Sequence, residues 1–205
     1  MRADFEDLKQ TFESMHSTLE SIAQQIEANL AEIFDGHLHI DKVSSRAKSV
    51  DSFMKKTLKV DKDGKLKYEV PLKEIQDMIG ARVVVYYKND VADVEAKIKE
   101  YYQTVERTTI IPDENSKFGY EGLHFVCLIP NVFRPSKSDI LLPDFFEMQI
   151  KTLFQHAWSQ SNHGLGYKPG ASLSDEEQRK LAYLAAQAWG ADKMLEELIN
   201  GQTIK

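Results

Sequence analysis

The chain has 205 residues, of which 42% are hydrophobic and 28% are charged, so it is long enough to bury one sizeable core. Its net charge is −6 and it has one cysteine, Cys127, which excludes an intrachain disulfide and a zinc site built from several cysteines. The apolar stretches are far shorter than the roughly 20 residues of a membrane-spanning helix, so we expect a soluble, cytoplasmic protein without a membrane segment.

The charge is unevenly distributed along the chain. Residues 1–36 contain eight acidic and two basic side chains, which accounts for the whole net charge. Residues 42–67 contain nine basic and three acidic side chains. This local positive surplus predicts a phosphate-binding segment, with a solvated lysine-rich face or hairpin as the alternative.

The first predicted element is a long amphipathic helix over residues 3–34. Its apolar side chains recur at spacings of three and four: Phe5, Leu8, Phe12, Met15, Leu19, Ile22, Ile26, Leu30 and Ile33. We expect this stripe to pack against the domain, with a helix-to-helix contact between chains as the alternative. Gly36 is the predicted stop signal, so the chain divides into an N-terminal helix, 1–36, and a domain over 37–205.

Two further helices and a strand are predicted in the first half of the chain. One helix begins near Ser49 and ends before Asp63-Gly64, a turn between two short lysine-rich arms. The β-branched and aromatic run over residues 79–87 predicts a buried strand. Asn89 or Asp90 can cap the helix that follows. The predicted buried face of this helix consists of Val91, Val94, Ile98 and Tyr101.

The second half of the chain completes a small sheet and two helices. Further strands are predicted over residues 108–111, 123–129 and 145–150. The helices cover residues 152–162 and 174–198, and the second opens with a capping box formed by Ser174 and Glu177. Helices that flank a mixed β-sheet place the fold in the α/β or α+β class.

Two carboxylates can meet on this sheet although they are far apart in the sequence. Asp77 lies just before the first predicted strand, and Glu147 lies within the last one. Paired carboxylates at strand ends can hold Mg²⁺ against a triphosphate, because this ion prefers one or two protein oxygens together with phosphate oxygens. Isolated acids at strand ends are also commonly just solvated, so the spacing alone leaves both interpretations open.

Five short motifs occur in order between residues 44 and 168. They are Arg46-Ala47-Lys48 with Ser52, Asp77-Met78-Ile79-Gly80-Ala81-Arg82, Gly119-Tyr120-Glu121-Gly122-Leu123-His124, Glu147-Met148-Gln149-Ile150-Lys151-Thr152, and Trp158 with His163 and Tyr167-Lys168. As a set they resemble the synthetase domain of the RelA/SpoT family, whose members transfer pyrophosphate from ATP to a ribose 3′-hydroxyl. The resemblance implies a nucleotidyltransferase-like fold, a mixed β-sheet flanked by helices.

The resemblance also implies roles for the donor and catalytic residues. The implied ATP-binding residues are Arg46, Lys48, Ser52 and Arg82. Asp77 and Glu147 are the implied catalytic residues. Asp77 binds Mg²⁺, and Glu147 either shares the metal or takes the proton from the attacking hydroxyl.

A second group of residues is implied to bind the acceptor or to support the site. The implied acceptor-binding residues are Lys117, Tyr120, His124 and Gln149. The ring of Tyr120 is implied to stack on the acceptor base. The implied supporting residues are Lys151, His163, Tyr167 and Lys168. His156 matches no motif and is not expected to support the site.

The acceptor motif departs from the usual family sequence at three positions. Gly122 replaces a serine, Phe118 replaces an asparagine, and Lys151 replaces an arginine, while Glu121 adds a negative charge beside the expected acceptor pocket. The donor and the reaction type are therefore better supported than the acceptor. No His-Asp dipeptide occurs, so we expect no hydrolase domain.

The resemblance leads to one expected function and two alternatives. The expected function is a small alarmone synthetase that uses ATP and Mg²⁺ to convert GDP or GTP into (p)ppGpp, the alarmone of the stringent response. One alternative is a toxin, paired with an antitoxin protein, that pyrophosphorylates the 3′ end of tRNA or makes adenosine alarmones. The other is a non-catalytic nucleotide-binding module. The apolar stripe of the first helix is also compatible with a homo-oligomer.

Overall fold

The computed structural model describes residues 2–112, 117–119, 121–136, 141–165 and 173–203, with the backbone alone for 2–4, 163–165 and 202–203. Its strands are β1 (Ile40–Ala47), β2 (Ile79–Val85), β3 (Thr104–Ile110), β4 (Gly122–Leu128) and β5 (Phe145–Thr152). They form one mixed sheet in the order β1-β2-β5-β4-β3. β2 and β5 are parallel, and the other neighbours are antiparallel.

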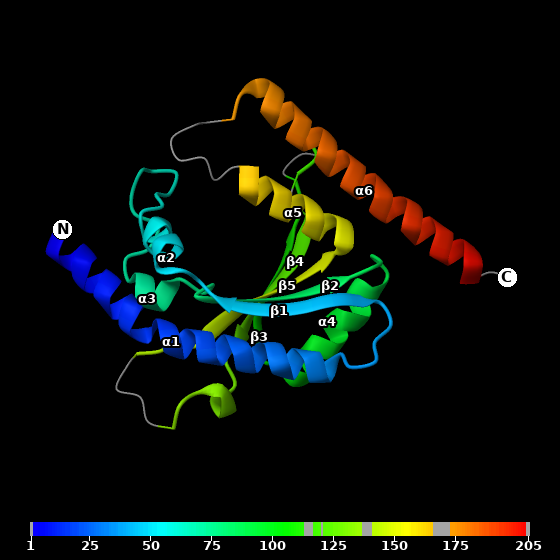
Figure 1. The fold of residues 1–205 in the computed structure, drawn as a ribbon. Coiled ribbons are helices and arrows are strands. Elements are labelled where there is room, and N and C mark those ends of the chain that lie inside the picture. The colour runs from blue at the N-terminus through cyan, green and yellow to red at the C-terminus, as the bar shows by residue number, and fades with distance from the viewer. Residues whose placement is uncertain (1, 113–116, 120, 137–140, 166–172, 204–205) are drawn as a thin grey trace.

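Helices lie on both faces of this sheet (Figure 1). They are α1 (Arg2–Ile33), α2 (Val50–Thr57), α3 (Pro71–Glu74), α4 (Asp90–Tyr101), α5 (Leu153–Leu165) and α6 (Asp175–Thr203), with a short 3₁₀ turn, η1 (Asn131–Phe133). α1 and α4 cover one face, and α5 and α6 lie over the other. The predicted mixed sheet with flanking helices is confirmed. None of the helices in the described part of the chain has the length and apolar character that a bilayer crossing requires.

The long helix α1 is part of the hydrophobic core. Its fully buried side chains are Phe12, Met15, Leu19, Ile22, Ile26 and Leu30. Burying each of them contributes about 1.5–3 kcal/mol. The ring of Phe12 stacks on that of Phe53 with 3.9 Å between centroids, so α1 also fixes α2. Packing of the stripe against the domain is therefore confirmed, and Gly36, at φ +73°, ends this region as predicted.

The edge strand β1 was not predicted. Its sequence, Ile-Asp-Lys-Val-Ser-Ser-Arg-Ala, contains few apolar residues and no fully buried ones. An edge strand with one polar face lacks the β-branched and aromatic run by which a central strand is recognised. β1 nevertheless pairs along β2 from Ile40 to Ala47, and the pairing places Arg46 opposite Gly80.

The predicted features around α4 need two corrections. Asn89 makes no side-chain cap, because its backbone is already helical, at φ −62° and ψ −32°, and its amide nitrogen donates to Asn200 on α6. Tyr101 is 54% exposed, whereas Tyr102 is buried and its hydroxyl donates to Asn29 of α1. Both tyrosines follow the buried Ile98 by about one helical turn, so the spacing alone does not distinguish them. The helix ends at Tyr101, and the side chain of Tyr102 is buried in the core.

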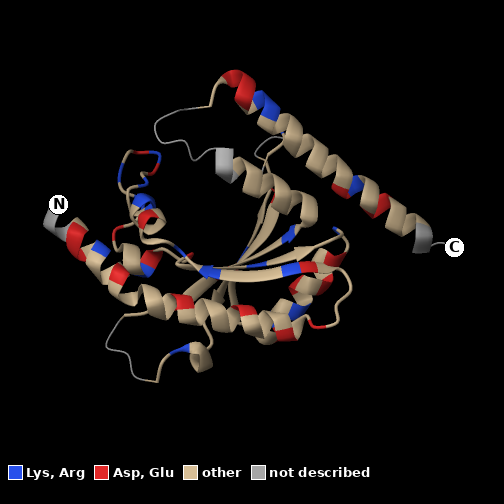
Figure 2. Ribbon diagram, viewed as in Figure 1, with Lys and Arg blue, Asp and Glu red and all other residues tan. Residues whose placement is uncertain are grey.

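Other local predictions are confirmed by hydrogen bonds. The Ser174 backbone N–H donates to Glu177, and the Glu177 N–H donates back to the Ser174 hydroxyl, which is the predicted capping box. Gly64 adopts φ +77° in the turn between the two lysine-rich arms. Basic residues gather at α2 and this turn, to one side of the sheet, while acidic residues line α1 (Figure 2).

Asp192 is a buried carboxylate that joins α6 to the end of β5. It is 2% exposed, and its Oδ2 accepts a hydrogen bond of 2.7 Å from the Thr152 hydroxyl. Burial raises the pKa of Asp192 to about 6, against the opposing effects of the Thr152 hydrogen bond and the Lys88 charge. Because the native state holds this proton more tightly than the unfolded chain, native stability falls as pH rises from about 4 to about 6.

We therefore expect Asp192→Asn to stabilise the protein at neutral pH. The amide keeps an acceptor for Thr152 but carries no charge, so the gain is up to about 3 kcal/mol above pH 6.5 and vanishes near pH 4. Urea unfolding at pH 4 and pH 7.5 measures it, with Glu197→Gln, an exposed acid on the same helix, as the control. A stability difference that does not change with pH would contradict the assignment.

Candidate active site

The motif residues gather on the sheet face that lies beneath α5 and α6. Neighbouring residues across paired strands point to the same face. One row of partners runs through Arg46, Gly80, Glu147 and Val126, and the next through Ser44, Arg82, Gln149, His124 and Thr108. The alternate residues of β5, Phe146, Met148 and Ile150, are buried in the core on the opposite face. The period-two pattern of β5 thus separates an apolar face from a polar one.

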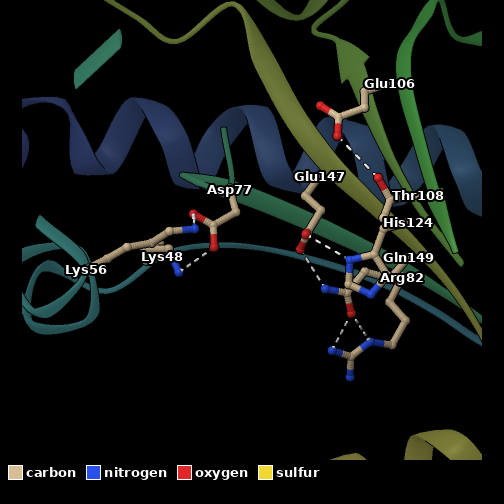
Figure 3. A network of polar contacts seen from close by, with 9 residues as sticks. All are labelled: Lys48, Lys56, Asp77, Arg82, Glu106, Thr108, His124, Glu147 and Gln149. Carbon is tan, nitrogen blue, oxygen red and sulfur yellow. Dashed lines mark hydrogen bonds and ion pairs between the residues drawn. The ribbon is translucent and has the colours of Figure 1, made fainter. Parts of the chain in front are cut away.

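Glu147 is held by two hydrogen bonds from residues of this polar face (Figure 3). His124 Nδ1 donates to Glu147 Oε1 at 2.9 Å, and Gln149 Nε2 donates to Oε2 at 2.6 Å. Burial alone would raise the pKa of Glu147, but the hydrogen bond and charge of His124, together with Gln149, lower it below its usual value. Glu147 is therefore an oriented, ionised carboxylate at neutral pH.

Gln149 connects Glu147 to Arg82. Its amide oxygen accepts hydrogen bonds from Arg82 Nε at 3.2 Å and from Arg82 Nη2 at 2.9 Å, while its amide nitrogen donates to Glu147. The two ends of one amide thus face a cation and an anion, which fixes its orientation. Arg82 Nη1 makes a further contact of 3.1 Å with His156 Nδ1 on α5.

Asp77 forms a second cluster at the start of β2. It pairs with Lys48 Nζ at 3.0 Å and with Lys56 Nζ at 2.8 Å (Figure 3). Burial opposes ionisation of Asp77, but the hydrogen bond to Lys56 and the charges of both lysines lower its pKa. The Lys48 backbone is fixed on both sides, since its N–H donates to Met78 and its carbonyl contacts His16 of α1.

Asp77 and Glu147 line one cavity of about 270 Å³, together with Lys56, Lys67 and Tyr68. No group of three or more histidine, cysteine or acidic side chains suited to a metal occurs in the described part of the chain. Two ionised carboxylates facing one cavity are, however, the hard oxygen donors that Mg²⁺ uses when phosphate oxygens and water complete its coordination. The oxygen ligands are therefore of the type that suits Mg²⁺ bound with a nucleotide, while in this structure Asp77 pairs with Lys48 and Lys56.

Lys151 lies deeper on the same face. It is 2% exposed, and its Nζ donates to the Ser159 hydroxyl of α5 at 3.1 Å. Burial and the charge of Arg82 lower the pKa of Lys151 to about 7, although Glu147 opposes the shift. The predicted supporting residue is therefore a buried lysine that joins the sheet to α5.

The other predicted residues lie at the margin of this face or cannot be placed on it. Arg46 is exposed on β1, Ser52 lies in the first turn of α2 beside its N-cap Ser49, and Lys117 is exposed. Tyr120, Tyr167 and Lys168 lie outside the described residues, and only the backbone of His163 is described, in α5.

Two residues of this group, Lys56 and His156, were not predicted. Lys56 pairs with Asp77, and the surplus of basic residues over 42–67 was the signal for it. His156, which was not expected to support the site, lies against it, because its ring contacts Arg82. Its position in the first turn of the helix that directly follows β5 could have indicated this, since that turn lies close to the strand that carries Glu147.

Comparison with known proteins links this geometry to a family. A family model described as a region found in RelA / SpoT proteins matches residues 45–172. GTP pyrophosphokinase YjbM from Bacillus subtilis (strain 168) is 26% identical over 174 residues, which cover 82% of this chain and 76% of that protein.

Solved structures share the whole fold at lower identity. Small alarmone synthetase 1 from Bacillus subtilis superposes with a TM-score of 0.76 at 19% identity, over 96% of this chain and 100% of that one. Structures of that synthetase bound to its product pppGpp and to AMPCPP give TM-scores of 0.74 and 0.71, at 21% and 19% identity. They cover 96% and 95% of this chain, and 100% and 99% of theirs. The mixed sheet and its helices therefore form the alarmone synthetase fold.

The Asp77 cluster predicts a change in protonation that can be measured without substrate. Lys56→Met removes one of the two cations beside Asp77, so the pKa of Asp77 rises. Carboxyl ¹³C chemical shifts followed over pH report it. Lys67→Met is the matched control, because Lys67 lines the same cavity but lies over the ring of Tyr68. Equal effects of the two substitutions would contradict the pairing.

Proposed function

This chain belongs to the RelA/SpoT family, and on that premise we propose that it is an ATP-dependent pyrophosphokinase. The proposed reaction transfers the β,γ-pyrophosphate of ATP to the 3′-hydroxyl of GDP or GTP and releases AMP. A relative described as a GTP pyrophosphokinase, and a synthetase structure bound to pppGpp, support this reaction class. The structure bound to AMPCPP, an ATP analogue, supports the donor.

The observation that carries the proposal is the combination of Glu147 with the cations around it. The carboxylate is ionised and oriented by His124 and Gln149, as a general base must be. Lys48 and Lys56 beside Asp77, and Arg82 beside Gln149, surround it with positive charge. Such a surface suits a highly charged triphosphate, because charge-assisted hydrogen bonds to phosphate are strong.

Glu147 takes the proton in the proposed step. The 3′-oxygen of the acceptor forms a bond to the β-phosphorus of ATP, and the bond from that phosphorus to the oxygen shared with the α-phosphate breaks. The electron pair of the broken bond leaves with AMP, and the hydroxyl proton passes to Glu147. A loose phosphoryl transition state needs little covalent help, so alignment and charge neutralisation supply most of the acceleration.

The cations and the second carboxylate act on the donor. Mg²⁺, held by Asp77 together with the phosphates, would neutralise charge on the triphosphate. Lys48, Lys56 and the exposed Arg46 bind and orient its oxygens, and Ser52 adds a hydroxyl at the first turn of α2. Arg82 suits a phosphate or a base, since its planar fork offers several donors.

The residues that depart from the usual acceptor motif have contacts within the fold. Glu121 lies 3.9 Å from Lys88 Nζ, so its negative charge is partly balanced within the chain. The ring of Phe118 packs edge-on against Trp189 of α6, with 5.8 Å between centroids. Gly122 is buried as the first residue of β4 and pairs with Ile110. Each departure thus has a place in the fold.

ATP labelled at the β-phosphate, offered with GDP, GTP, AMP, ATP or bulk tRNA in the presence of Mg²⁺, tests the acceptor. We expect label on GDP or GTP. Label on tRNA or on an adenine nucleotide would show that the acceptor is not a guanine nucleotide and would favour the toxin-type reaction. Binding of ATP without any transfer would favour a non-catalytic nucleotide-binding module.

Glu147→Gln is expected to lower kcat by a factor of about 10²–10⁴, because it removes the proton acceptor. Its affinity for a non-hydrolysable ATP analogue changes little, since the cations remain. Glu106→Gln is the control, because Glu106 is a carboxylate on an outer strand, hydrogen-bonded to Thr108. Rapid-quench kinetics and calorimetry separate the two effects. An active Glu147→Gln enzyme would refute the assigned role.

A further inference from the structure

Three contacts of the Arg82 guanidinium are to neutral groups. Nε and Nη2 donate to the amide oxygen of Gln149, and Nη1 lies 3.1 Å from His156 Nδ1. Gln149 comes from β5 and His156 from α5, so the guanidinium is held from two directions. These contacts from two elements fix the plane of the guanidinium.

The contact with Arg82 requires a neutral imidazole. A guanidinium can only donate hydrogen bonds, so Nδ1 of His156 must be the acceptor and Nε2 carries the hydrogen. Protonation of the ring would remove this acceptor and place a second positive charge next to Arg82. The contact therefore becomes repulsive when His156 is protonated.

The charges around His156 favour the neutral ring. Burial lowers the pKa of His156 first, and the positive charges of Arg82 from β2, Lys151 from β5 and Lys42 from β1 lower it further. The charge of Asp41 of β1 opposes this shift. At neutral pH the ring is thus available as an acceptor.

We propose that His156 is a positioning residue whose neutral ring holds Arg82 for the donor triphosphate, so that ATP binding weakens when His156 is protonated. This inference rests on the proposed function, which makes Arg82 a donor-binding residue. It also assigns α5 a part in donor binding, because this helix carries His156, the hydrogen-bond acceptor for Nη1 of Arg82. Nothing in the five sequence motifs indicates such a role.

Steady-state kinetics with two substitutions of His156 test the proposal. His156→Ala removes the hydrogen-bond acceptor of Arg82. We expect KM for ATP to rise about tenfold at pH 8, as for the loss of one charge-assisted hydrogen bond, with kcat within twofold of the wild type. His156→Asn places an amide oxygen near the position of Nδ1 and does not titrate. We expect it to restore KM at pH 8.

The pH profile distinguishes positioning from a structural role. Because the pKa of His156 is lowered below its usual value of 6.5, wild-type KM for ATP rises as pH falls below 6.5, and in His156→Asn this rise is smaller. The nucleotide titrates in both proteins, so the difference between the profiles reports the loss of the titrating His156 ring together with its charge interaction with Lys151. His37→Asn, at an exposed histidine near the start of β1, is the control and keeps the wild-type profile. Identical profiles for wild type and His156→Asn would overturn the proposal.

A measurement without turnover keeps this inference separate from the proposed function. The His156 imidazole resonance, assigned by its loss in His156→Asn, is titrated by NMR in the wild type and in Arg82→Gln. Removing the adjacent cation raises the pKa of His156 if the two side chains are in contact. An unchanged pKa would overturn the contact itself. Absence of pyrophosphate transfer with an intact Arg82–His156 coupling would instead count against the proposed function alone.

Discussion

The parallel pairing of β2 with β5 is the constraint on which the rest of the site depends. It places Gly80 opposite Glu147 and Arg82 opposite Gln149, although these residues are far apart in the sequence. Asp77, which lies just before β2, thereby comes to line the same cavity as Glu147. A shift of one residue would turn every side chain of β5 to the other face, so packing of the buried Met148 and Ile150 fixes the strand register of the candidate site.

The polar face is costly to bury, and the network of contacts offsets that cost. A buried charge without a partner is strongly unfavourable, and here the ionised groups have partners from other elements. Asp77 pairs with lysines that follow β1 and lie in α2, and Glu147 pairs with His124 of β4. The same contacts that make burial tolerable also set the protonation states, so stability and chemistry share one set of interactions.

Much of the site could be predicted as a list of residues, but not as a set of contacts. The motifs named Asp77, Glu147, Gln149 and Arg82, and the structure brings the last three into one chain of hydrogen bonds. That Gln149 bridges Arg82 to Glu147 depends on strand register. That His156 touches Arg82 depends on how α5 is rotated over the sheet. Neither property is encoded in the spacing of a motif.

The sequence by itself determined the elements whose physics is local. These elements depend on neighbours within a few residues, so the sequence alone predicts them: the apolar period of α1, the hydrophobic run of β2 and the capping box of α6. The sequence alone did not predict β1, because this polar edge strand forms only through its pairing with β2. The tertiary structure alone decided which polar side chains meet, since cross-strand register and helix docking are set by long-range packing in the core.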